Sequence, residues 1–311
     1  MAKILVTGGA GYIGSMLVPE LLRKGHEVTV IDTFMYGQTS LLDMCYYKTL
    51  DVVRGDARNE ELMRKYIGDA DFIFPLAAIV GMPACNKDPL LATTTNSGAI
   101  ELILKLRKSG QNIIFPNTNS GYGIGQQSAF CDETTPLNPI SLYGRTKVDA
   151  EKALLGAGNA ITLRLATVFG MSPRMRFDLL VNDFVYKALI DKSIVLFEAH
   201  FKRNFIHVRD VARAFIHAME HFNTMKNEPY NVGLSTANLN KRELCEMIQK
   251  HISDFVFLES EIGQDPDKRN YIVSNEKIEK TGFQPEVSLD EGIRELIKGY
   301  QILRRTTFTN L

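Results

Sequence analysis

The first fourteen residues, MAKILVTGGAGYIG, constrain the fold of this 311-residue chain more than any other stretch. Residues 3–7 form a short apolar run, glycines follow at positions 8, 11 and 14, and a helical pattern begins near Gly11. The order of strand, glycine turn and helix is the one that binds a dinucleotide, although this glycine spacing is tighter than the commonest form. Gly8 permits a sharp turn, Gly11 a close approach of the backbone to a pyrophosphate, and Gly14 packing of the helix on the strand.

An acidic residue at the end of the second expected strand, residues 28–31, supports the same interpretation. Asp32 lies about 20 residues after the glycines, where a ribose-binding acid is expected. Its carboxylate can accept hydrogen bonds from both ribose hydroxyls and repels a 2′-phosphate, and the next residue is Thr33 instead of an arginine. The sequence therefore favours NAD over NADP. The alternative is a glycine turn in an unrelated α/β protein, with Asp32 as a local cap.

Composition and charge argue against several other functions. The chain has 36 Lys and Arg and 36 Asp and Glu, so its formal net charge is zero. We therefore expect no nucleic-acid partner and no membrane partner, since no apolar run approaches the ~20 residues of a membrane span. The N-terminus enters the glycine turn where a secretory peptide would keep its apolar stretch, so we expect a cytoplasmic protein. Isolated cysteines without a CxxC pair predict reduced thiols and no metal site; they are Cys45, Cys85, Cys131 and Cys245.

Strands and helices alternate through the first half of the chain. Helical patterns, among them residues 90–106 and 141–153, separate short apolar runs, and Pro75 suggests that the fourth strand ends inside its run. This alternation predicts an α/β fold with a doubly wound parallel sheet of the Rossmann type. The six strands expected there are residues 3–7, 28–31, 51–54, 71–78, 112–116 and 161–165.

The pattern loosens after Phe169, which predicts a smaller mixed α/β C-terminal substrate domain. We expect residues 1–165 to form the NAD-binding domain, residues 205–232 to return to it, and residues 166–311 to bind mainly substrate. The ligands then belong in the crevice between the two. For this half we expect helices at 178–190 and 211–221, strands at 194–197, 229–232, 255–258 and 271–273, and three amphipathic helices between residues 240 and 300.

Two polar residues of the first half have alternative interpretations. Asp56 follows the third strand, so it can bind the adenine amino group or cap the helix that starts near Asn59. Asn96 lies among apolar residues of the 90–106 helix. It is either a surface amide or a buried tie to a strand backbone near the cofactor.

Tyr143, Lys147 and Thr118 are the candidate catalytic residues. Tyr143 and Lys147 are four residues apart on one helix, so both side chains project from one face. A phenol has a pKa of about 10, but a nearby ammonium and a cationic nicotinamide favour the phenolate, which can take a proton from a substrate hydroxyl. Thr118, at the end of a strand, can hydrogen-bond the same oxygen. A YxxxK string also occurs by chance on surface helices, but the preceding NAD turn and the hydroxyl-bearing strand end favour the catalytic interpretation.

Ordered motifs run through nearly the whole chain: TGGAGYIG, GDAR, LAA, the 118–123 loop, YGRTK, LRLATVFG and RNFIHVRDVA. With them the chain resembles extended short-chain dehydrogenases/reductases of the NAD-dependent epimerase and dehydratase type, which act on nucleotide sugars. The resemblance implies that Tyr143 is the base, that Lys147 binds the nicotinamide ribose and lowers the tyrosine pKa, and that Thr118 is their hydroxyl partner. It implies a homodimer through the helices at 90–106 and 143–154. The NAD site that it implies comprises Gly8, Gly11, Tyr12, Ile13, Asp32, Thr33, Asp56, Ala57, Leu76, Ala77, Ala78, Asn96, Tyr143 and Lys147.

For the substrate, the resemblance implies that Arg203 reaches the sugar diphosphate. Arg174 and Arg176 suit a diphosphate clamp by charge and fork geometry, and a solvated basic loop is the alternative. Arg269 can supply a further cation, although the family's arginine one turn earlier is Gln264 here. Further candidates are Thr118, Asn119 and Asn182; His207, His217 and His221 are expected to be packed, hydrogen-bonded histidines.

Two departures from the family pattern narrow the reaction. Sugar-nucleotide 4,6-dehydratases of this family carry Asp or Glu within two residues of the catalytic Thr, whereas this chain has Asn119 and Ser120. Dehydration is therefore disfavoured, and oxidation at carbon 4 is expected. The keto sugar is then released by a 4-dehydrogenase or reduced on its other face by a 4-epimerase.

The 118–123 loop and the stretch LRLATVFGMSPRMRFD are similar to those of bacterial GDP-heptose 4-dehydrogenases of capsule polysaccharide pathways. This resemblance suggests a GDP-linked heptose or hexose as substrate. A non-catalytic NAD-binding protein is the alternative from another class, but such proteins usually lose the tyrosine or the lysine, and both are present here.

Overall fold

The computed structural model describes residues 1–124, 130–263 and 269–303. Its centre is a seven-stranded sheet in the order β11-β7-β5-β4-β1-β2-β3, with every neighbouring pair parallel. The order reverses between β1 and β4, which is the position where open α/β sheets bind ligands. The predicted doubly wound sheet is thus confirmed. The strands are β1 (Lys3–Thr7), β2 (Glu27–Asp32), β3 (Leu50–Arg54), β4 (Phe72–Pro75), β5 (Asn112–Thr118), β7 (Ala160–Leu165) and β11 (Pro229–Val232).

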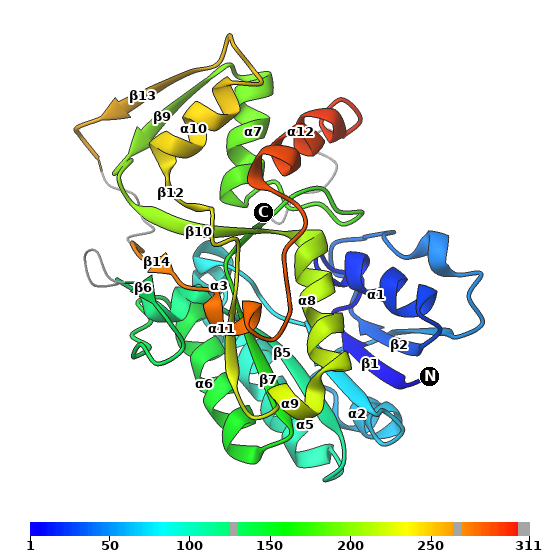
Figure 1. Cartoon of the computed structure of the whole chain (residues 1–311). Helices are drawn as coiled ribbons and strands as arrows, with labels where there is room; N and C mark the ends of the chain where they lie inside the picture. The colour runs from blue at the N-terminus through cyan, green and yellow to red at the C-terminus, as the bar shows by residue number, and fades with distance from the viewer. Residues whose placement is uncertain (125–129, 264–268, 304–311) are drawn as a thin grey trace.

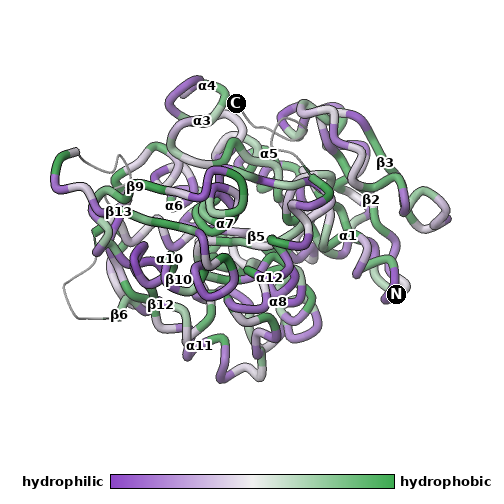
Figure 2. Tube along the Cα trace, turned by 90° about the horizontal axis from the view of Figure 1, so that it is seen from above, coloured by the Kyte–Doolittle hydropathy of each residue, from purple (hydrophilic) through white to green (hydrophobic). Residues whose placement is uncertain are grey.

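Helices cover both faces of this sheet because alternate strand residues point to opposite sides. Ile4 and Val6 belong to one apolar core with α1 (Gly14–Arg23), α8 (Val208–Glu220) and α9 (Phe222–Met225), whereas Leu5 belongs to the core on the other side. That second side carries α2 (Glu60–Ile67), α5 (Ala99–Leu106) and α6 (Leu142–Ala157). Figure 1 shows α1 beside α8, and Figure 2 shows β5 as a hydrophobic stretch in the middle of the molecule.

The helix expected at 90–106 is interrupted. Asp88 caps a short α4 (Pro89–Thr93) by accepting a hydrogen bond from the Leu91 N–H. A π turn, η2 (Thr94–Gly98), follows and leads into α5. Such bulges frequently lie at functional sites, and this one holds Asn96 against the segment after β4. β4 ends at Pro75, as the sequence predicts, and α3 (Met82–Lys87) follows.

Other boundaries move because of caps that periodicity does not reveal. α8 begins at Val208, three residues earlier than expected, because the His207 ring accepts a hydrogen bond from the Arg209 N–H. α6 extends to Ala157 and ends at Gly158, whose φ of 75° favours glycine. α7 (Leu180–Ile190) starts two residues later than expected.

The C-terminal half packs around its own apolar core, in the upper part of Figure 1. A three-stranded sheet pairs β8 (Thr167–Phe169), β10 (Lys202–His207) and β12 (Asn238–Asn240), and β9 (Ser193–Phe197) pairs with β13 (Val256–Ser260). Within residues 205–232, β11 joins the central sheet and α8 packs on α1, whereas residues 205–207 belong to β10. The remaining elements are η1 (Leu42–Met44), η3 (Asn119–Tyr122), β6 (Phe130–Cys131) paired with β14 (Ile272–Val273), α10 (Lys241–Gln249), α11 (Glu276–Glu279) and α12 (Leu289–Gly299).

In the parts of the chain that the structure describes, no helix has the length and apolar character needed to cross a membrane. The same residues contain no group of three or more His, Cys, Asp or Glu side chains arranged to hold a metal ion.

Candidate active site

A cavity of about 670 Å³ lies at the carboxyl ends of the central strands, where the two halves of the chain meet. One end is lined by the glycine turn, Asp32 and the 76–83 segment after β4, and the other by residues of the C-terminal half. It therefore joins the predicted cofactor residues to the predicted substrate residues in one space.

The glycine turn has the shape that a dinucleotide needs. Gly8 has a φ of 71°, and a Cβ there would lie 2.6 Å from the Ala77 nitrogen, so glycine is required. A Cβ at Gly11 would meet only the Gly8 oxygen, at 3.1 Å, and Gly11 lines the cavity. Gly14 presses on the backbone of Gly9 in the turn itself, instead of on the strand as expected. The turn thus leaves its backbone open toward the cavity at Gly11.

Asp32 presents its carboxylate at the same end of the cavity. One oxygen accepts a hydrogen bond from the Ala10 N–H at 3.0 Å, and the other accepts from the Phe34 N–H at 2.8 Å and from Gln38 at 3.2 Å. Burial raises the pKa of Asp32, and these hydrogen bonds oppose that rise. They fix the carboxylate where the predicted ribose contact requires it.

Thirteen of the fourteen residues predicted for the NAD site line the cavity; Asn96 is the exception. The Asn96 amide accepts a hydrogen bond from the Ile79 N–H at 2.8 Å and donates one to the Ile79 oxygen at 3.0 Å. It is therefore the buried tie of the two alternatives, and it supports the cavity wall from behind. Asp56 does not cap α2, because Asn59 does so, and its carboxylate is paired with Arg58.

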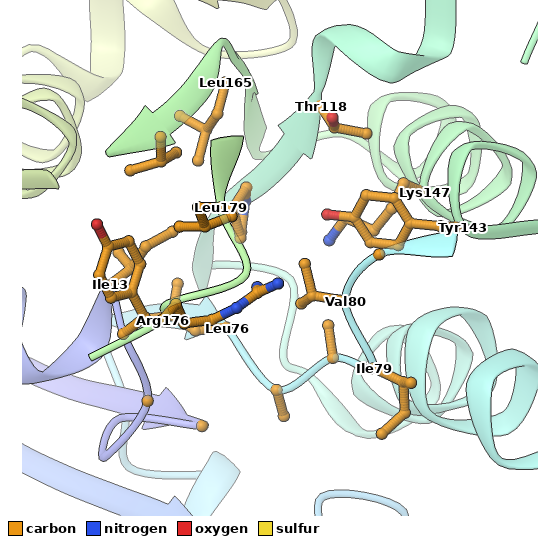
Figure 3. Close-up of a pocket in the computed structure, with 18 of the residues that line it drawn as sticks. Ile13, Leu76, Ile79, Val80, Thr118, Tyr143, Lys147, Leu165, Arg176 and Leu179 are labelled. Atoms are coloured by element: carbon orange, nitrogen blue, oxygen red, sulfur yellow. The ribbon is translucent and has the colours of Figure 1, made fainter. Parts of the chain in front are cut away.

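Thr118, Tyr143 and Lys147 lie together on one side of the cavity (Figure 3). Ser141 caps α6 by accepting a hydrogen bond from the Gly144 N–H, which sets Tyr143 in the first turn and Lys147 one turn later. Thr118 is the last residue of β5 and lies next to them. The Lys147 ammonium lies 3.7 Å from the centre of the Phe115 ring. A helix start and a strand end thus bring the three side chains together.

Burial shifts the pKa of both ionisable members of this group. It raises the pKa of Tyr143 to about 12, and the charges of Arg176 and Arg269 oppose the rise. It lowers the pKa of Lys147 to about 7, against the attraction of Glu151. At neutral pH the Tyr143 phenol is therefore protonated unless a further positive charge comes close.

A buried polar network that sequence reasoning missed holds α6 in place. The Glu151 carboxylate forms a salt bridge with Arg164 at 2.7 Å, and both side chains are at most 6% exposed. It also accepts hydrogen bonds from Asn117 and Thr162, each at 2.7 Å. Glu151 is one turn after Lys147, so the network connects α6 with β5 and β7 directly beneath the catalytic candidates.

The four predicted arginines all line the cavity, but at different places. Arg174 stacks on the Tyr36 ring, 4.5 Å from its centre, and acts electrostatically on Asp32, so it lies at the cofactor end. Arg176 is bound to Asp178 through two nitrogens. Arg174 and Arg176 therefore do not form the single diphosphate clamp that their spacing suggests.

Further cations of the C-terminal half also line the cavity. Arg203 lies over the Tyr271 ring, 5.6 Å from its centre, and an Arg269 nitrogen donates to the Ser120 hydroxyl. Ser120 in turn accepts a hydrogen bond from Thr118 at 2.9 Å. Lys241, which the sequence did not single out, also lines the cavity. The family position that is Gln264 in this chain lies outside the described residues.

Asn119 and Asn182 do not line the cavity, so the structure does not support direct substrate contacts for them. Asn182 is fully buried; it accepts a hydrogen bond from the Gly170 N–H at 2.9 Å and donates one to the Arg176 oxygen at 2.8 Å. Asn119 is 1% exposed in η3. The Asn182 amide thus supports its loop from behind, whereas within the described part of the chain neither polar atom of the Asn119 side chain has a hydrogen-bond partner.

The histidines are mostly packed, as expected. His207 is fully buried at the start of α8, and His217 is half-buried with a ring nitrogen 2.8 Å from the Thr281 hydroxyl. His221 is exposed and stacks on His217, which corrects its expected burial.

The family model described as the NAD dependent epimerase/dehydratase family matches residues 4–233. This chain belongs to that family. Among the curated proteins, a putative UDP-glucose 4-epimerase of Methanocaldococcus jannaschii is 28% identical and aligns over 97% of this chain and 100% of its own length. The family member described here is therefore an enzyme.

Two solved structures have folds similar to that of this chain. The UDP-glucose 4-epimerase of Thermotoga maritima with UDP-glucose matches with a TM-score of 0.85 and 25% identity, over 96% of this chain and 99% of its own. The UDP-glucuronic acid 4-epimerase of Bacillus cereus, in complex with UDP-glucuronic acid and NAD, matches with a TM-score of 0.84 and 25% identity, over 97% and 100%. The family member thus shares its whole architecture with nucleotide-sugar epimerases.

Proposed function

We propose that this enzyme oxidises carbon 4 of a nucleotide-diphosphate sugar with NAD. The observation that supports this most directly is the cavity itself. Thr118, Tyr143 and Lys147 line it at the end of β5 and the start of α6, and the same cavity continues to the glycine turn and Asp32. A proton acceptor and a dinucleotide site within one cavity are what removal of hydrogen from an alcohol requires.

The residues present suit NAD. The backbone at Gly11 is open to the cavity for a pyrophosphate, and the fixed Asp32 carboxylate suits the two hydroxyls of an unphosphorylated ribose. When bound there, NAD supplies the oxidant for carbon 4.

The remaining steps belong to the chain's own side chains. Tyr143 takes the proton of the 4-hydroxyl, and Thr118 hydrogen-bonds the same oxygen while its charge develops. Lys147, when protonated, stabilises the Tyr143 phenolate, and burial of the pair strengthens that attraction. The pKa of about 12 for Tyr143 without a ligand means that its proton is lost only when positive charge gathers at the site.

Arg203, Lys241 and Arg269 are proposed to bind the diphosphate. They come from β10, α10 and the segment before β14, and all three line the cavity. Three cations suit a group that carries two or more negative charges. The resemblance of residues 163–178 to GDP-heptose 4-dehydrogenases of capsule pathways supports a GDP-linked heptose or hexose as the substrate.

Dehydration remains disfavoured. A 4,6-dehydratase needs a carboxylic acid that protonates the leaving hydroxyl, and the residues after Thr118 are Asn119 and Ser120. Asp178 also lines the cavity, but Arg176 outweighs the effect of burial and lowers its pKa, so this carboxylate is ionised and cannot donate a proton.

The first candidate activity is that of a 4-dehydrogenase, which releases the keto sugar. A 4-epimerase is the second, and the likeness to UDP-glucose and UDP-glucuronic acid 4-epimerases favours it. The mass of the product separates the two, because an epimer keeps the mass of the substrate and a keto sugar has lost two hydrogens. Loss of water would instead contradict the argument from Asn119 and Ser120.

The Tyr143→Phe variant tests the proposal. It keeps the aromatic ring but removes the proton acceptor, so turnover of candidate nucleotide sugars should fall by about 10²-fold or more while NAD remains bound. Tyr36→Phe, at the far end of the cavity, is the matched control and should keep most of the activity. Full activity of Tyr143→Phe would refute the proposal, and NAD binding without turnover of any nucleotide sugar by the native chain would favour a non-catalytic role.

A further inference from the structure

One ion pair in the cavity is not explained by cofactor or diphosphate binding. Arg176 and Asp178 both line the cavity, and Arg176 donates from Nε to one Asp178 oxygen at 3.0 Å and from Nη2 to the other. The Arg176 side chain is 10% exposed and that of Asp178 is 38% exposed. The largely buried Arg176 and the partly exposed Asp178 together present an ion pair without net charge to the cavity.

This pair lies beside the reaction centre. Figure 3 shows the Arg176 guanidinium pointing into the cavity toward Val80 and the Tyr143 side. Its Nη2 atom would lie 4.0 Å from a Cβ at Gly81, on the loop that carries Val80. Among the charged groups that shift the pKa of Tyr143, Arg176 has the largest effect. The pair is therefore close to the atoms that surround carbon 4 of a sugar held by Tyr143 and Thr118.

The geometry of a pyranose ring bears on which part of the sugar lies beside the Arg176–Asp178 pair. Carbon 1, with the diphosphate, is the ring position opposite carbon 4, whereas carbon 5 with its exocyclic group is adjacent to carbon 4. Arg203, Lys241 and Arg269, which line the cavity, are already assigned to the diphosphate. An orientation in which carbon 5 faces the Arg176–Asp178 pair, and carbon 3 faces away from it, brings the exocyclic group beside the pair.

We infer that the Arg176–Asp178 pair reads the exocyclic group of the sugar and selects a neutral, hydroxylated chain over a carboxylate. A sugar hydroxyl both donates and accepts, so it can bond to a guanidinium N–H and to a carboxylate oxygen at once. A hexuronate would instead bring a second negative charge beside Asp178, whose own charge already balances Arg176. This inference rests on the proposed oxidation at carbon 4 and adds the class of sugar to it.

The inference separates this chain from one of its structural neighbours. The Bacillus cereus enzyme was solved with UDP-glucuronic acid, a sugar with a carboxylate on carbon 5. For the chain described here, a neutral hexose or a longer sugar with further hydroxyl groups is the preferred substrate.

Matched pairs of nucleotide sugars test this directly. UDP-glucose and UDP-glucuronic acid, and GDP-mannose and GDP-mannuronic acid, differ within each pair only at the exocyclic carbon. Dissociation constants are measured by calorimetry on the full chain with NAD, and carbon 4 oxidation is followed separately. The wild type should bind the neutral sugar of at least one pair about tenfold or more tighter than its uronate.

The Asp178→Asn variant removes the negative charge and keeps the size of the side chain. The binding ratio should shift toward the uronate by about tenfold or more, because Arg176 then faces the ligand without a balancing charge. Asp183→Asn, which changes another acid that lines the cavity and pairs with Lys187, is the control and should leave the ratio unchanged.

The outcomes separate this inference from the proposed function. A wild-type preference for the uronates, or a ratio that Asp178→Asn leaves unchanged, would overturn the inference even if carbon 4 oxidation proceeds. The expected ratios without oxidation of any sugar would support the inference and overturn the proposed reaction. Failure to bind either neutral sugar would overturn the inference.

Discussion

Lys147 illustrates how a single buried residue couples function to stability. Its ammonium lies against the Phe115 ring, and burial lowers its pKa from 10.5 to about 7. Between these two pH values the unfolded chain binds a proton at Lys147 that the folded chain does not hold, so the free energy of unfolding must rise with pH over that range. Below about pH 7 the full destabilisation by the buried ammonium is present. A shift of this size corresponds to roughly 5 kcal/mol.

The Lys147→Met variant should therefore be more stable than the wild type at neutral pH in the absence of ligands. The wild type should gain stability relative to the variant by about 1 kcal/mol per pH unit between about pH 7 and pH 10, since only the wild type carries this titration. Urea denaturation at several pH values measures the difference. Parallel pH profiles of the two proteins would show that Lys147 titrates normally.

The residue scale also shows what sequence reasoning can locate. Tyr143, Lys147 and Thr118 could be predicted to converge because a helix and a strand end fix the direction of each side chain. Arg174 could not be placed, because residues 171–178 form an irregular segment in which spacing does not set direction. Asn182 lies on α7, and the direction of its side chain could not be known before the packing of that helix was known. Arg174 turns to Tyr36 and Asn182 to Gly170, away from the expected diphosphate.

Among the elements, α6 depends on its contact with β5 and β7 through Glu151 and Arg164. No motif points to this network, since it joins residues whose partners are known only once the strand order is known. The π turn was likewise missed, because its five residues, TTNSG, contain no proline and the apolar periodicity resumes directly after them in α5.

Replacing Glu151 alone should strongly destabilise the protein. Glu151→Leu leaves the Arg164 charge buried without its partner, which should lower the free energy of unfolding by about 3–5 kcal/mol. The double variant with Arg164→Met should cost less than the two single variants added together. Denaturant titration checks this, with Glu220→Gln in the exposed Lys24–Glu220 pair as a control that should change stability by less than about 1 kcal/mol. If the double variant lost as much unfolding free energy as the two single variants together, the coupling of Glu151 and Arg164 would be contradicted.

At the scale of the whole molecule, the sheet could be predicted because strand and helix patterns alternate over six cycles. The small sheets of the C-terminal half could not, since β6 with β14 and β9 with β13 join segments far apart in the sequence by short pairings. Of these pairings, the one of β14 with β6 lies next to the cavity, since Arg269 and Tyr271 line the cavity just before β14.

A homodimer is proposed at this scale. The helical segment of residues 89–106 packs beside α6 on the outside of the sheet (Figure 1), and its Leu90 is 75% exposed. Such a pair of helices can form a four-helix interface with a second copy. Light scattering should give about twice the chain mass of 34.9 kDa. Ala153→Arg on the exposed side of α6 should produce monomers, whereas Asn223→Arg on α9 should not; a monomeric wild type would refute the dimer.

The most direct test of the central claim is to follow deuterium placed at carbon 4 of a nucleotide sugar that the enzyme turns over. Oxidation by the NAD-loaded enzyme should transfer the label from carbon 4 to the nicotinamide, where a 4-dehydrogenase leaves it and from where a 4-epimerase returns it to carbon 4. Formation of reduced nicotinamide should be slower than with unlabelled substrate. Deuterium at carbon 3 or carbon 5 should have neither effect. Product formed with the label still on carbon 4, without any reduction of the nicotinamide, would contradict oxidation at that carbon.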